Sequence, residues 1–324
     1  MHIVIAGAAG FLGNKLARTL LDVGTLIGPS GQPEKITRMT LVDVVAPVGF
    51  SDSRVEIIEG DISDPKIVDA IIIPSIDSIF HLAAIVSGHA EVDFDLGMKI
   101  NFDATRQILD RARALGTQPR MVFTSSVAVF GGDLPAKVPD NMGLMPQSSY
   151  GAQKAMCELL VNDYSRRGYI DGRVLRMPTI SVRPGVPNKA ASSFASGILR
   201  EPINGQNAVC PVSSDTRLWL MSPRQAVQNL IYGHNVDATQ FANSRIVSLP
   251  GLSVTVREMV DALESVAGTE VTQRIQWIED DAVKRIVNSW PGDFEATRAK
   301  AMGFTADTDF ISVIRAHIQD ESAA

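Results

Sequence analysis

Short apolar runs alternate with stretches of helical apolar spacing through the first half of the chain. Residues 2–6 form a β-branched apolar run, and Phe11, Leu16 and Leu20 then follow on one helix face. Further strands are predicted at 39–45, 55–58, 78–82, 120–124 and 173–176, and helices at about 99–115 and 151–167. This β–α alternation predicts an α/β fold, a Rossmann-type doubly wound parallel sheet with helices on both faces.

The pattern loosens after Pro178, where prolines punctuate short segments. A strand near 246–249 and a helix at about 255–267 are still predicted from their apolar spacing. We therefore predict two domains. The Rossmann domain spans 1–177, and a smaller C-terminal α/β domain for substrate binding spans 178–324, from which some segments return to the sheet.

Three glycines lie where the first strand turns into the first helix, in the spacing G-x-x-G-x-x-G. Gly7 permits a tight turn, Gly10 lets backbone approach a pyrophosphate, and Gly13 lets helix and strand pack closely. Phe11 and Leu12 begin the helix, whose free N–H groups and partial positive charge suit phosphates. A glycine-rich turn without a ligand is the alternative, but the position between strand and amphipathic helix favours dinucleotide binding.

Asp43 lies near the end of the second predicted strand, where a carboxylate can accept hydrogen bonds from both adenosine-ribose hydroxyls. It would repel a 2′-phosphate, and no arginine follows it directly, so NAD is favoured over NADP. The gap from the glycine motif exceeds the usual distance of about 20 residues because of an insertion at 24–37. We expect that insertion to be a surface loop. A turn acid at a strand end is the alternative interpretation of Asp43.

Composition and charge restrict the class of protein. With 324 residues, 45% apolar and 20% charged, the chain suits a soluble globular protein with a large core. A net charge of −6 argues against nucleic acid as a partner, and no clean apolar run of about 18 residues predicts a membrane span. Cys157 and Cys210 fit a reducing compartment, and the N-terminus has no basic leader. We expect a cytoplasmic protein without a metal site.

Tyr150 and Lys154 form a Tyr-x-x-x-Lys unit, which places both side chains on one helix face. A free phenol has a pKa of about 10, and a nearby ammonium together with an oxidised nicotinamide would favour its phenolate. Tyr150 could then accept the proton of a substrate hydroxyl while hydride leaves. Ser126, at the end of the fifth strand, can hydrogen-bond the same oxygen, and Ser125 sits beside it. A helix-surface pair is the alternative, but the glycine turn and Asp43 favour a catalytic set.

Motifs that occur in order along residues 1–230 are the glycine turn at 7–13, Asp61-Ile62, His81-Leu82-Ala83-Ala84, Asn101, and the segments 125–131 and 150–154. Together they resemble the extended short-chain dehydrogenase/reductase family. The resemblance implies NAD as the cofactor, with Asp61 and Ile62 at the adenine and Ala83 in the cofactor cleft. It implies that Asn101 supports the surroundings of Lys154. We interpret His81 as a packed strand residue.

The resemblance has further implications for the cofactor and for assembly. Lys154 would also bind the nicotinamide-ribose hydroxyls, and backbone at Thr179 and Ile180 would meet the carboxamide. The helices near 100–115 and 151–167 would form a homodimer interface, as in many members of the family.

Candidate substrate groups favour a small sugar acid. Capture of a carboxylate needs a cation or several hydrogen bonds, and Arg183 and Arg217 both lie in the substrate half. Ser87, Asn188 and Ser192 could add hydrogen bonds. A structural salt bridge is the alternative for each arginine.

Two departures from the family pattern weaken a nucleotide-sugar substrate. Leu218-Trp219 stands where sugar-nucleotide epimerases commonly have Asp-Tyr after an arginine, and Phe130 stands in place of a tyrosine. The favoured prediction is NAD-dependent oxidation of a hydroxyl beside a carboxylate. The alternatives are a nucleotide-sugar epimerase or dehydratase, another sugar-acid or uronate dehydrogenase, and a non-catalytic NAD sensor. The retained Tyr150 and Lys154 disfavour the sensor.

Overall fold

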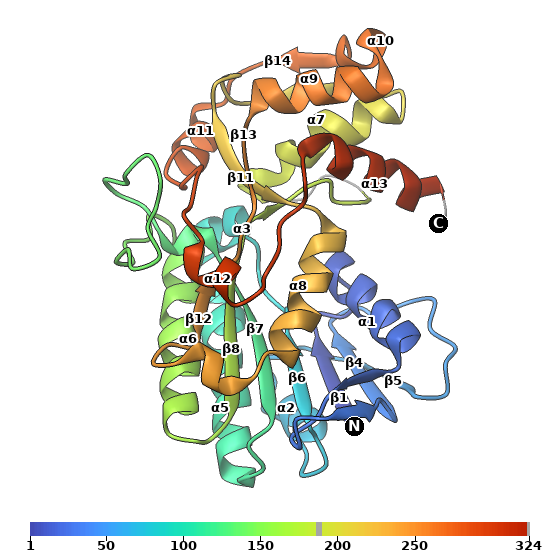
Figure 1. Ribbon diagram of the computed structural model, residues 1–324, viewed down its shortest axis with the longest axis vertical. Helices are drawn as coiled ribbons and strands as arrows, with labels where there is room; N and C mark the ends of the chain where they lie inside the picture. Colours follow the sequence, from blue (N-terminus) through green and yellow to red (C-terminus); the bar gives the residue numbers. More distant parts are fainter. Residues whose placement is uncertain (186–189, 323–324) are drawn as a thin grey trace.

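A parallel sheet forms the centre of the larger lobe (Figure 1). The computed structural model describes residues 1–185 and 190–322. The strands are β1 (His2–Ala6), β4 (Arg38–Asp43), β5 (Val55–Glu59), β6 (Ser78–His81), β7 (Arg120–Ser126), β8 (Asp171–Met177) and β12 (Ile246–Ser248). They lie in the order β12-β8-β7-β6-β1-β4-β5, and all neighbours are parallel. The predicted Rossmann-type sheet is confirmed.

Helices cover both faces of this sheet. The helices α1 (Phe11–Val23) and α8 (Pro223–Asn235) lie on one face, and α2 (Pro65–Ile71), α5 (Ala104–Leu115) and α6 (Ser149–Arg166) on the other. Along β1, Ile3 and Ile5 pack on the α1 side, whereas Val4 and Ala6 pack on the α5 side. Because successive strand residues face opposite sides, a strand covered on both faces needs an unbroken apolar run, as β1 has.

The smaller lobe is built from short strands and helices. A three-stranded sheet contains β9 (Thr179–Ile180), β11 (Arg217–Met221) and β13 (Leu252–Thr255), and β10 (Ala208–Cys210) pairs with β14 (Ile275–Trp277). The helices are α7 (Phe194–Ile203), α9 (Val256–Ala267), α10 (Thr269–Thr272), α11 (Asp281–Val287) and α13 (Phe310–Ser322). The helix predicted near 255 begins with a capping box between Thr255 and Glu258.

Several shorter elements complete the part of the chain that the structure describes. They are α3 (Ser87–Val92), α4 (Phe94–Gly97), the π-helix η1 (Met98–Asp103), the 3-10 turns η2 (Val127–Val129), η3 (Ala191–Ser193) and η4 (Ala238–Phe241), and α12 (Thr297–Ala301). The π-helix falls where the sequence pattern predicts the first turn of an ordinary helix.

The expectation of a surface loop at 24–37 is wrong. That segment folds into a hairpin of β2 (Thr25–Ile27) and β3 (Pro33–Lys35), and Leu26 and Ile36 are buried in the core. Arg120 donates to the carbonyl of Ile27 at 2.8 Å. The hairpin forms because apolar residues lie on either side of a glycine-containing turn. The prediction of a loop rested on the turn residues and did not weigh these apolar positions.

The chain after residue 178 returns to the larger lobe. Helix α8 covers one face of the large sheet, and β12 pairs with β8 at its edge. A division at 177/178 remains our proposal for the domain boundary, with α8 and β12 as the returning segments.

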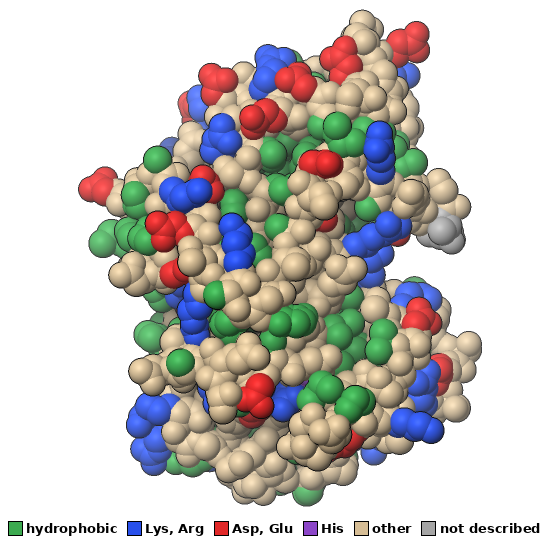
Figure 2. Space-filling model, viewed as in Figure 1, with side chains coloured by type: hydrophobic (Ala, Val, Ile, Leu, Met, Phe, Trp, Pro, Cys, Tyr) green, Lys and Arg blue, Asp and Glu red, His purple; other side chains and the backbone are tan. Residues whose placement is uncertain are grey.

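No helix within residues 1–185 and 190–322 has both the length and the apolar character that crossing a bilayer requires. On the face seen in Figure 2, lysine and arginine side chains are interspersed with aspartate and glutamate.

A buried charge cluster lies at the amino ends of β7 and β8. Asp171 accepts hydrogen bonds from Arg120 at 3.2 Å, from Arg245 at 2.8 Å and from Arg173, whose side chain is fully buried. Burial lowers the pKa of Arg173 to about 10. Burial acts to raise the pKa of Asp171, but the three arginines hold it below its usual range.

We expect Asp171→Asn to lower the free energy of unfolding by about 3–5 kcal/mol, because it leaves Arg173 buried without a carboxylate. Asp171 has a depressed pKa in the folded state. Its contribution is therefore present above the unfolded pKa of about 3.9 and is lost as pH falls through the folded value. Urea unfolding measured at pH 7 and pH 3 checks both points. Asp163→Asn, at an exposed ion pair, is the control; an equal effect of the two changes would contradict the prediction.

Candidate active site

A groove runs along the carboxyl ends of the parallel strands and joins two cavities. The first lies between the glycine turn, the end of β7, the start of α6 and the segment after β8. The second lies between the glycine turn and the ends of β4, β5 and β6. Gly7, Gly10, Leu82 and Ala84 line both. A continuous groove of this kind can hold a molecule with two separated ends, such as a dinucleotide.

The glycine turn has the geometry that phosphate binding needs. Gly7 has φ of +89°, and a Cβ atom there would lie 2.6 Å from the backbone nitrogen of Ala83. A Cβ on Gly13 would collide with the carbonyl oxygen of Gly7. Gly10 is the N-cap of α1 and has no side chain to satisfy the first N–H groups of the helix. Those donors and the helix dipole suit a pyrophosphate.

The predicted adenosine groups line the second cavity. Asp43 accepts from the backbone N–H groups of Ala9 at 2.9 Å and Val44 at 2.8 Å, so its carboxylate is tied to the glycine turn. Asp61 also lines this cavity, and its carboxylate accepts from Ser63. Burial acts to raise the pKa of Asp61, but hydrogen bonds from Ser63 and Lys99 hold it below the usual range. Ile62 and Ala83 complete the wall.

Asn101 lies in the π-helix η1, and its side chain contacts neighbouring backbone and Gln153 instead of lining either cavity. Its side-chain oxygen accepts from the N–H of Ile85 at 2.7 Å, and its amide donates to the Ile85 carbonyl at 3.1 Å. The amide also donates to Gln153 on α6 at 2.7 Å. Asn101 therefore holds the loop after β6, and it contacts α6 at Gln153 and, through its backbone carbonyl, at Cys157.

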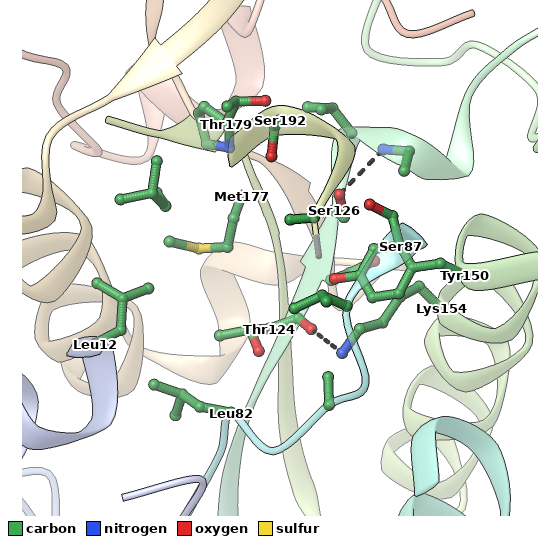
Figure 3. A pocket seen from close by; sticks show the side chains of 18 of the residues that line it. Leu12, Leu82, Ser87, Thr124, Ser126, Tyr150, Lys154, Met177, Thr179 and Ser192 are labelled. Atoms are coloured by element: carbon green, nitrogen blue, oxygen red, sulfur yellow. Dashed lines mark hydrogen bonds between the residues drawn. The ribbon is translucent and has the colours of Figure 1, made fainter. Parts of the chain in front are cut away.

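The three predicted catalytic residues meet in the first cavity. Ser126 ends β7, and Tyr150 and Lys154 lie one turn apart on α6, whose N-cap Ser148 accepts from the Gly151 N–H at 3.2 Å. Figure 3 shows Tyr150 and Lys154 side by side, with Lys154 reaching the carbonyl of Thr124 at 2.9 Å. The cap and the strand end thus fix both halves of the set.

Two cations act on the set in different ways. Burial raises the pKa of Tyr150 to about 12, against the charge of Arg183 and a hydrogen bond with Ser126, both of which lower it. Burial lowers the pKa of Lys154 to about 8, against Cys157 and Glu158. We predicted Lys154 as the protein cation that favours the phenolate. In this structure the cation whose charge lowers the pKa of Tyr150 is Arg183.

Ser87, Ser192 and Arg183 form the wall opposite the strands. Arg183 donates from Nη2 to Ser192 Oγ at 3.0 Å and from Nε to the carbonyl of Ile180 at 3.0 Å. It forms no ion pair with any residue that the structure describes. The described lining of this cavity contains two cations, Lys154 and Arg183, and no carboxylate. Thr179 and Ile180 lie at the same wall, as predicted for the carboxamide end.

Two other predicted substrate residues, Ser125 and Arg217, make their side-chain contacts elsewhere. Ser125 is among the residues that line the first cavity, but its hydroxyl donates to the Glu158 carboxylate at 2.5 Å. Arg217 is exposed, contacts Ser253 at 3.4 Å and pairs loosely with Glu258. It is absent from the described lining of the cavity because β9, whose two residues line the cavity, pairs with the opposite end of β11. Asn188 lies outside the described residues.

Trp290 lines the cavity and was missed by the sequence analysis. It follows α11, in a part of the chain where no motif marks a site. His81 is fully buried and hydrogen-bonds Thr105 at 2.9 Å, and burial lowers its pKa to about 3, which agrees with a packed strand residue. Within the described residues no group of three His, Cys, Asp or Glu side chains could hold a metal ion.

This fold and site define a dinucleotide-binding enzyme of the Rossmann type with a Ser-Tyr-Lys set. The model of the NAD dependent epimerase/dehydratase family matches residues 3–219, and the chain belongs to that family. Its cofactor is NAD.

Two curated relatives are similar along the whole chain. A D-erythronate dehydrogenase of Cupriavidus necator is 55% identical, with 100% of both chains covered. A D-erythronate dehydrogenase of Haemophilus influenzae is 46% identical, over 98% of this chain and 99% of that one. The protein is an NAD-dependent oxidoreductase.

Solved structures are similar as well. The crystal structure of a nucleoside-diphosphate-sugar epimerase from Agrobacterium tumefaciens matches with a TM-score of 0.93 at 45% identity, over 100% of this chain and 95% of that one. An L-threonine dehydrogenase from Cupriavidus necator shares the fold, with a TM-score of 0.85 at 22% identity over 99% of this chain and all of that one.

Proposed function

We propose that this protein oxidises D-erythronate to 2-dehydro-D-erythronate, with NAD as oxidant and the C2 hydroxyl as the reacting group. The full-length similarity to two D-erythronate dehydrogenases supports the substrate. The observation that carries the proposal in this chain is Arg183, a cation beside Tyr150 with no acidic partner among the described residues. A desolvated cation is costly without an anion, and a substrate carboxylate would provide one.

In the proposed reaction Arg183, Ser192 and Ser87 hold the carboxylate, which places the adjacent C2 hydroxyl at Tyr150. Tyr150 accepts the hydroxyl proton, and Ser126 hydrogen-bonds the same oxygen. The bound cofactor supplies the hydride acceptor. The positive charge of Arg183 and the hydrogen bond with Ser126 favour the phenolate form of Tyr150, against the burial that raises its pKa.

The same proposal assigns the cofactor groups. Gly7, Gly10 and Gly13, with the N–H groups at Phe11 and Leu12, would bind the pyrophosphate. The adenosine would occupy the cavity lined by Asp43, Asp61, Ile62 and Ala83. Lys154, Thr179 and Ile180 would meet the nicotinamide riboside.

We expect Asp43→Ser to raise the dissociation constant for NAD about tenfold and to narrow the preference for NAD over NADP. The change removes the acceptor for the ribose hydroxyls and the charge that repels a 2′-phosphate. Fluorescence titration with both cofactors checks it. Asp52→Asn, in a partly buried ion pair with Arg54 on the connection that follows β4, is the matched control. An unchanged NAD to NADP ratio in Asp43→Ser would rule out the assignment.

The substrate is tested by NADH formation over a panel of acids and polyols. We expect turnover with D-erythronate and none with erythritol, which has the same carbon chain without the carboxylate. Turnover of erythritol at a similar rate would contradict the proposed role of Arg183 in binding the substrate carboxylate. Turnover of longer acids or uronates in preference to D-erythronate would shift the proposal to another sugar-acid dehydrogenase.

A nucleotide-sugar epimerase is the second candidate, and the solved epimerase structure favours it. An epimerase returns the hydride to its substrate, so it would convert UDP-hexoses without accumulating NADH. Product analysis after incubation with UDP-hexoses separates the two. The same assays identify an NAD sensor, which would bind NAD and convert neither substrate.

The assembly and the compartment are parts of the proposal. We propose a homodimer through α5 and α6, where Leu159 is 62% exposed on α6. Light scattering of wild type and Leu159→Glu tests it. The two cysteines are buried and unpaired, which supports a reducing, cytoplasmic compartment.

A further inference from the structure

A buried ion pair stands behind the catalytic set, outside the described lining of the cavity. Glu158 lies on α6 one turn beyond Lys154, and its side chain is fully buried. Arg176 of β8 donates to both carboxylate oxygens, from Nε at 2.8 Å and from Nη2 at 2.7 Å. Ser125 of β7 donates to the same carboxylate at 2.5 Å. One carboxylate therefore ties α6 to two neighbouring strands.

Arg176 is fixed in turn by its own contacts. Its guanidinium lies 4.7 Å from the centre of the Phe130 ring, and Nη1 reaches Ser248 of β12 at 3.5 Å. Replacing a buried ion pair with apolar residues is often neutral or stabilising, so the presence of this pair is weak support for a role in stability alone. Its position suggests a role in the geometry of the site.

Helix α6 contacts both of the β7 residues that precede Ser126, which are Thr124 and Ser125. Lys154 donates to the carbonyl of Thr124 at 2.9 Å, and Glu158 accepts from Ser125. These two bonds fix the end of β7 against the helix that carries Tyr150. A shift of either would change the distance between Ser126 and Tyr150, which must hold the same substrate oxygen.

Glu158 also contributes the negative charge near Lys154. Cys157 and Glu158 on α6 both act to raise the pKa of Lys154. Lys154 in turn lowers the pKa of His81 on β6, and Tyr150 lies one helical turn before Lys154. Burial keeps His81 neutral and raises the pKa of Cys157 to about 11, so neither is charged at pH 7. Asp103 of η1 faces Cys157. The β7 side offers the Thr124 carbonyl and the Phe123 ring, 4.6 Å from the ammonium.

We propose that Glu158, held by Arg176, is a positioning residue of the active site: it fixes Ser126 and Lys154 against Tyr150 and places a buried carboxylate one helical turn from Lys154. This inference rests on the proposed catalytic role of Tyr150 and Lys154.

The test is the pH profile of kcat and kcat/KM for Glu158→Gln, with Asp163→Asn on the exposed face of α6 as the matched control. Lys154 holds its proton below its pKa and loses it as pH rises. Removal of the Glu158 charge lowers that pKa, so the alkaline loss of activity begins at lower pH than in wild type. We expect kcat at neutral pH to fall about tenfold or more from misplacement of Ser126. A wild-type profile and kcat would overturn the proposal.

Glu158→Gln leaves Arg176 unpaired and could fail to fold, so a second variant carries the same test. Glu158→Gln combined with Arg176→Met removes both charges, and a neutral pair is tolerated in buried positions. Ser125→Ala removes one hydrogen bond and keeps the ion pair, so it is expected to lower kcat without shifting the alkaline limb. If the folded double variant keeps wild-type kcat and pH profile, the pair is structural only.

Failure of this inference is distinguishable from failure of the proposed function. The pH dependence of the NAD dissociation constant needs no substrate, because Lys154 is a proposed ribose ligand. In wild type the affinity is expected to fall as pH rises through the pKa of Lys154, and in the double variant the fall begins at lower pH. If no sugar acid is turned over, the proposed function is wrong while this comparison still decides the role of Glu158.

Discussion

Tyr150→Phe is expected to lower kcat/KM for D-erythronate oxidation by about 10³-fold or more while NAD binding is retained. The substitution removes only the phenolic oxygen, which is the proposed proton acceptor, and general acid–base catalysis contributes factors of about 10²–10⁴. The ring still packs beside Lys154, whose ammonium lies 5.7 Å from its centre. The measurement is steady-state NADH formation together with titration of NAD binding.

The pH dependence of the wild type follows from the same residue. Burial raises the pKa of Tyr150 to about 12, so the neutral phenol dominates near pH 7 and the reactive phenolate increases with pH. Activity should therefore rise with pH until Lys154, with a pKa lowered to about 8 by burial, loses its proton. In Tyr150→Phe any residual activity should lack the rising limb.

Tyr164 offers a matched control on the same helix. Its hydroxyl donates to Asp110 at 2.6 Å, far along α6 from the cavity. Tyr164→Phe should leave kcat unchanged, since it removes a phenolic oxygen that touches neither cavity. Comparable losses in both variants would show that the effect is structural, and an active Tyr150→Phe would exclude Tyr150 as the base.

The parts of the site that depend on local geometry could be predicted from the sequence. Gly7 and Gly13 occupy positions where any side chain would collide with backbone, so the glycine spacing in the sequence predicts the turn. Tyr150 and Lys154 share a helix face because four residues make about one turn. Asp43 ends a strand that pairs in parallel with β1, which brings its carboxylate to the glycine turn. Each of these contacts arises from one helix or from neighbouring parallel strands.

The substrate wall could not be predicted in the same way, because it depends on how distant segments pack. Arg183 and Arg217 were both predicted as carboxylate ligands, yet of the two only Arg183 lines the cavity. Strand β9 pairs with the carboxyl end of β11, and Arg217 lies at the other end of β11 beside Ser253. The side-chain contact of Ser125 also could not be predicted from the sequence. Neighbouring strand residues face opposite sides, so Ser126 reaches the cavity and Ser125 reaches Glu158.

Arg183→Met is expected to lower kcat/KM for D-erythronate by about 10²-fold, equivalent to about 3 kcal/mol, because it removes the cation that would pair with the carboxylate. Arg183 also lowers the pKa of Tyr150, so its loss should move the rising limb of the pH profile to higher pH. The effect should therefore appear in both KM and kcat.

Arg217→Met is the matched control, since it removes the same charge at an exposed position that contacts Ser253 and Glu258. We expect it to change kcat/KM by less than about threefold, in line with the small value of exposed ion pairs. Both arginines were predicted from the sequence as carboxylate ligands, so this comparison tests the placement that the fold gives them. A larger loss in Arg217→Met than in Arg183→Met would reverse the assignment and place the carboxylate at the start of β11.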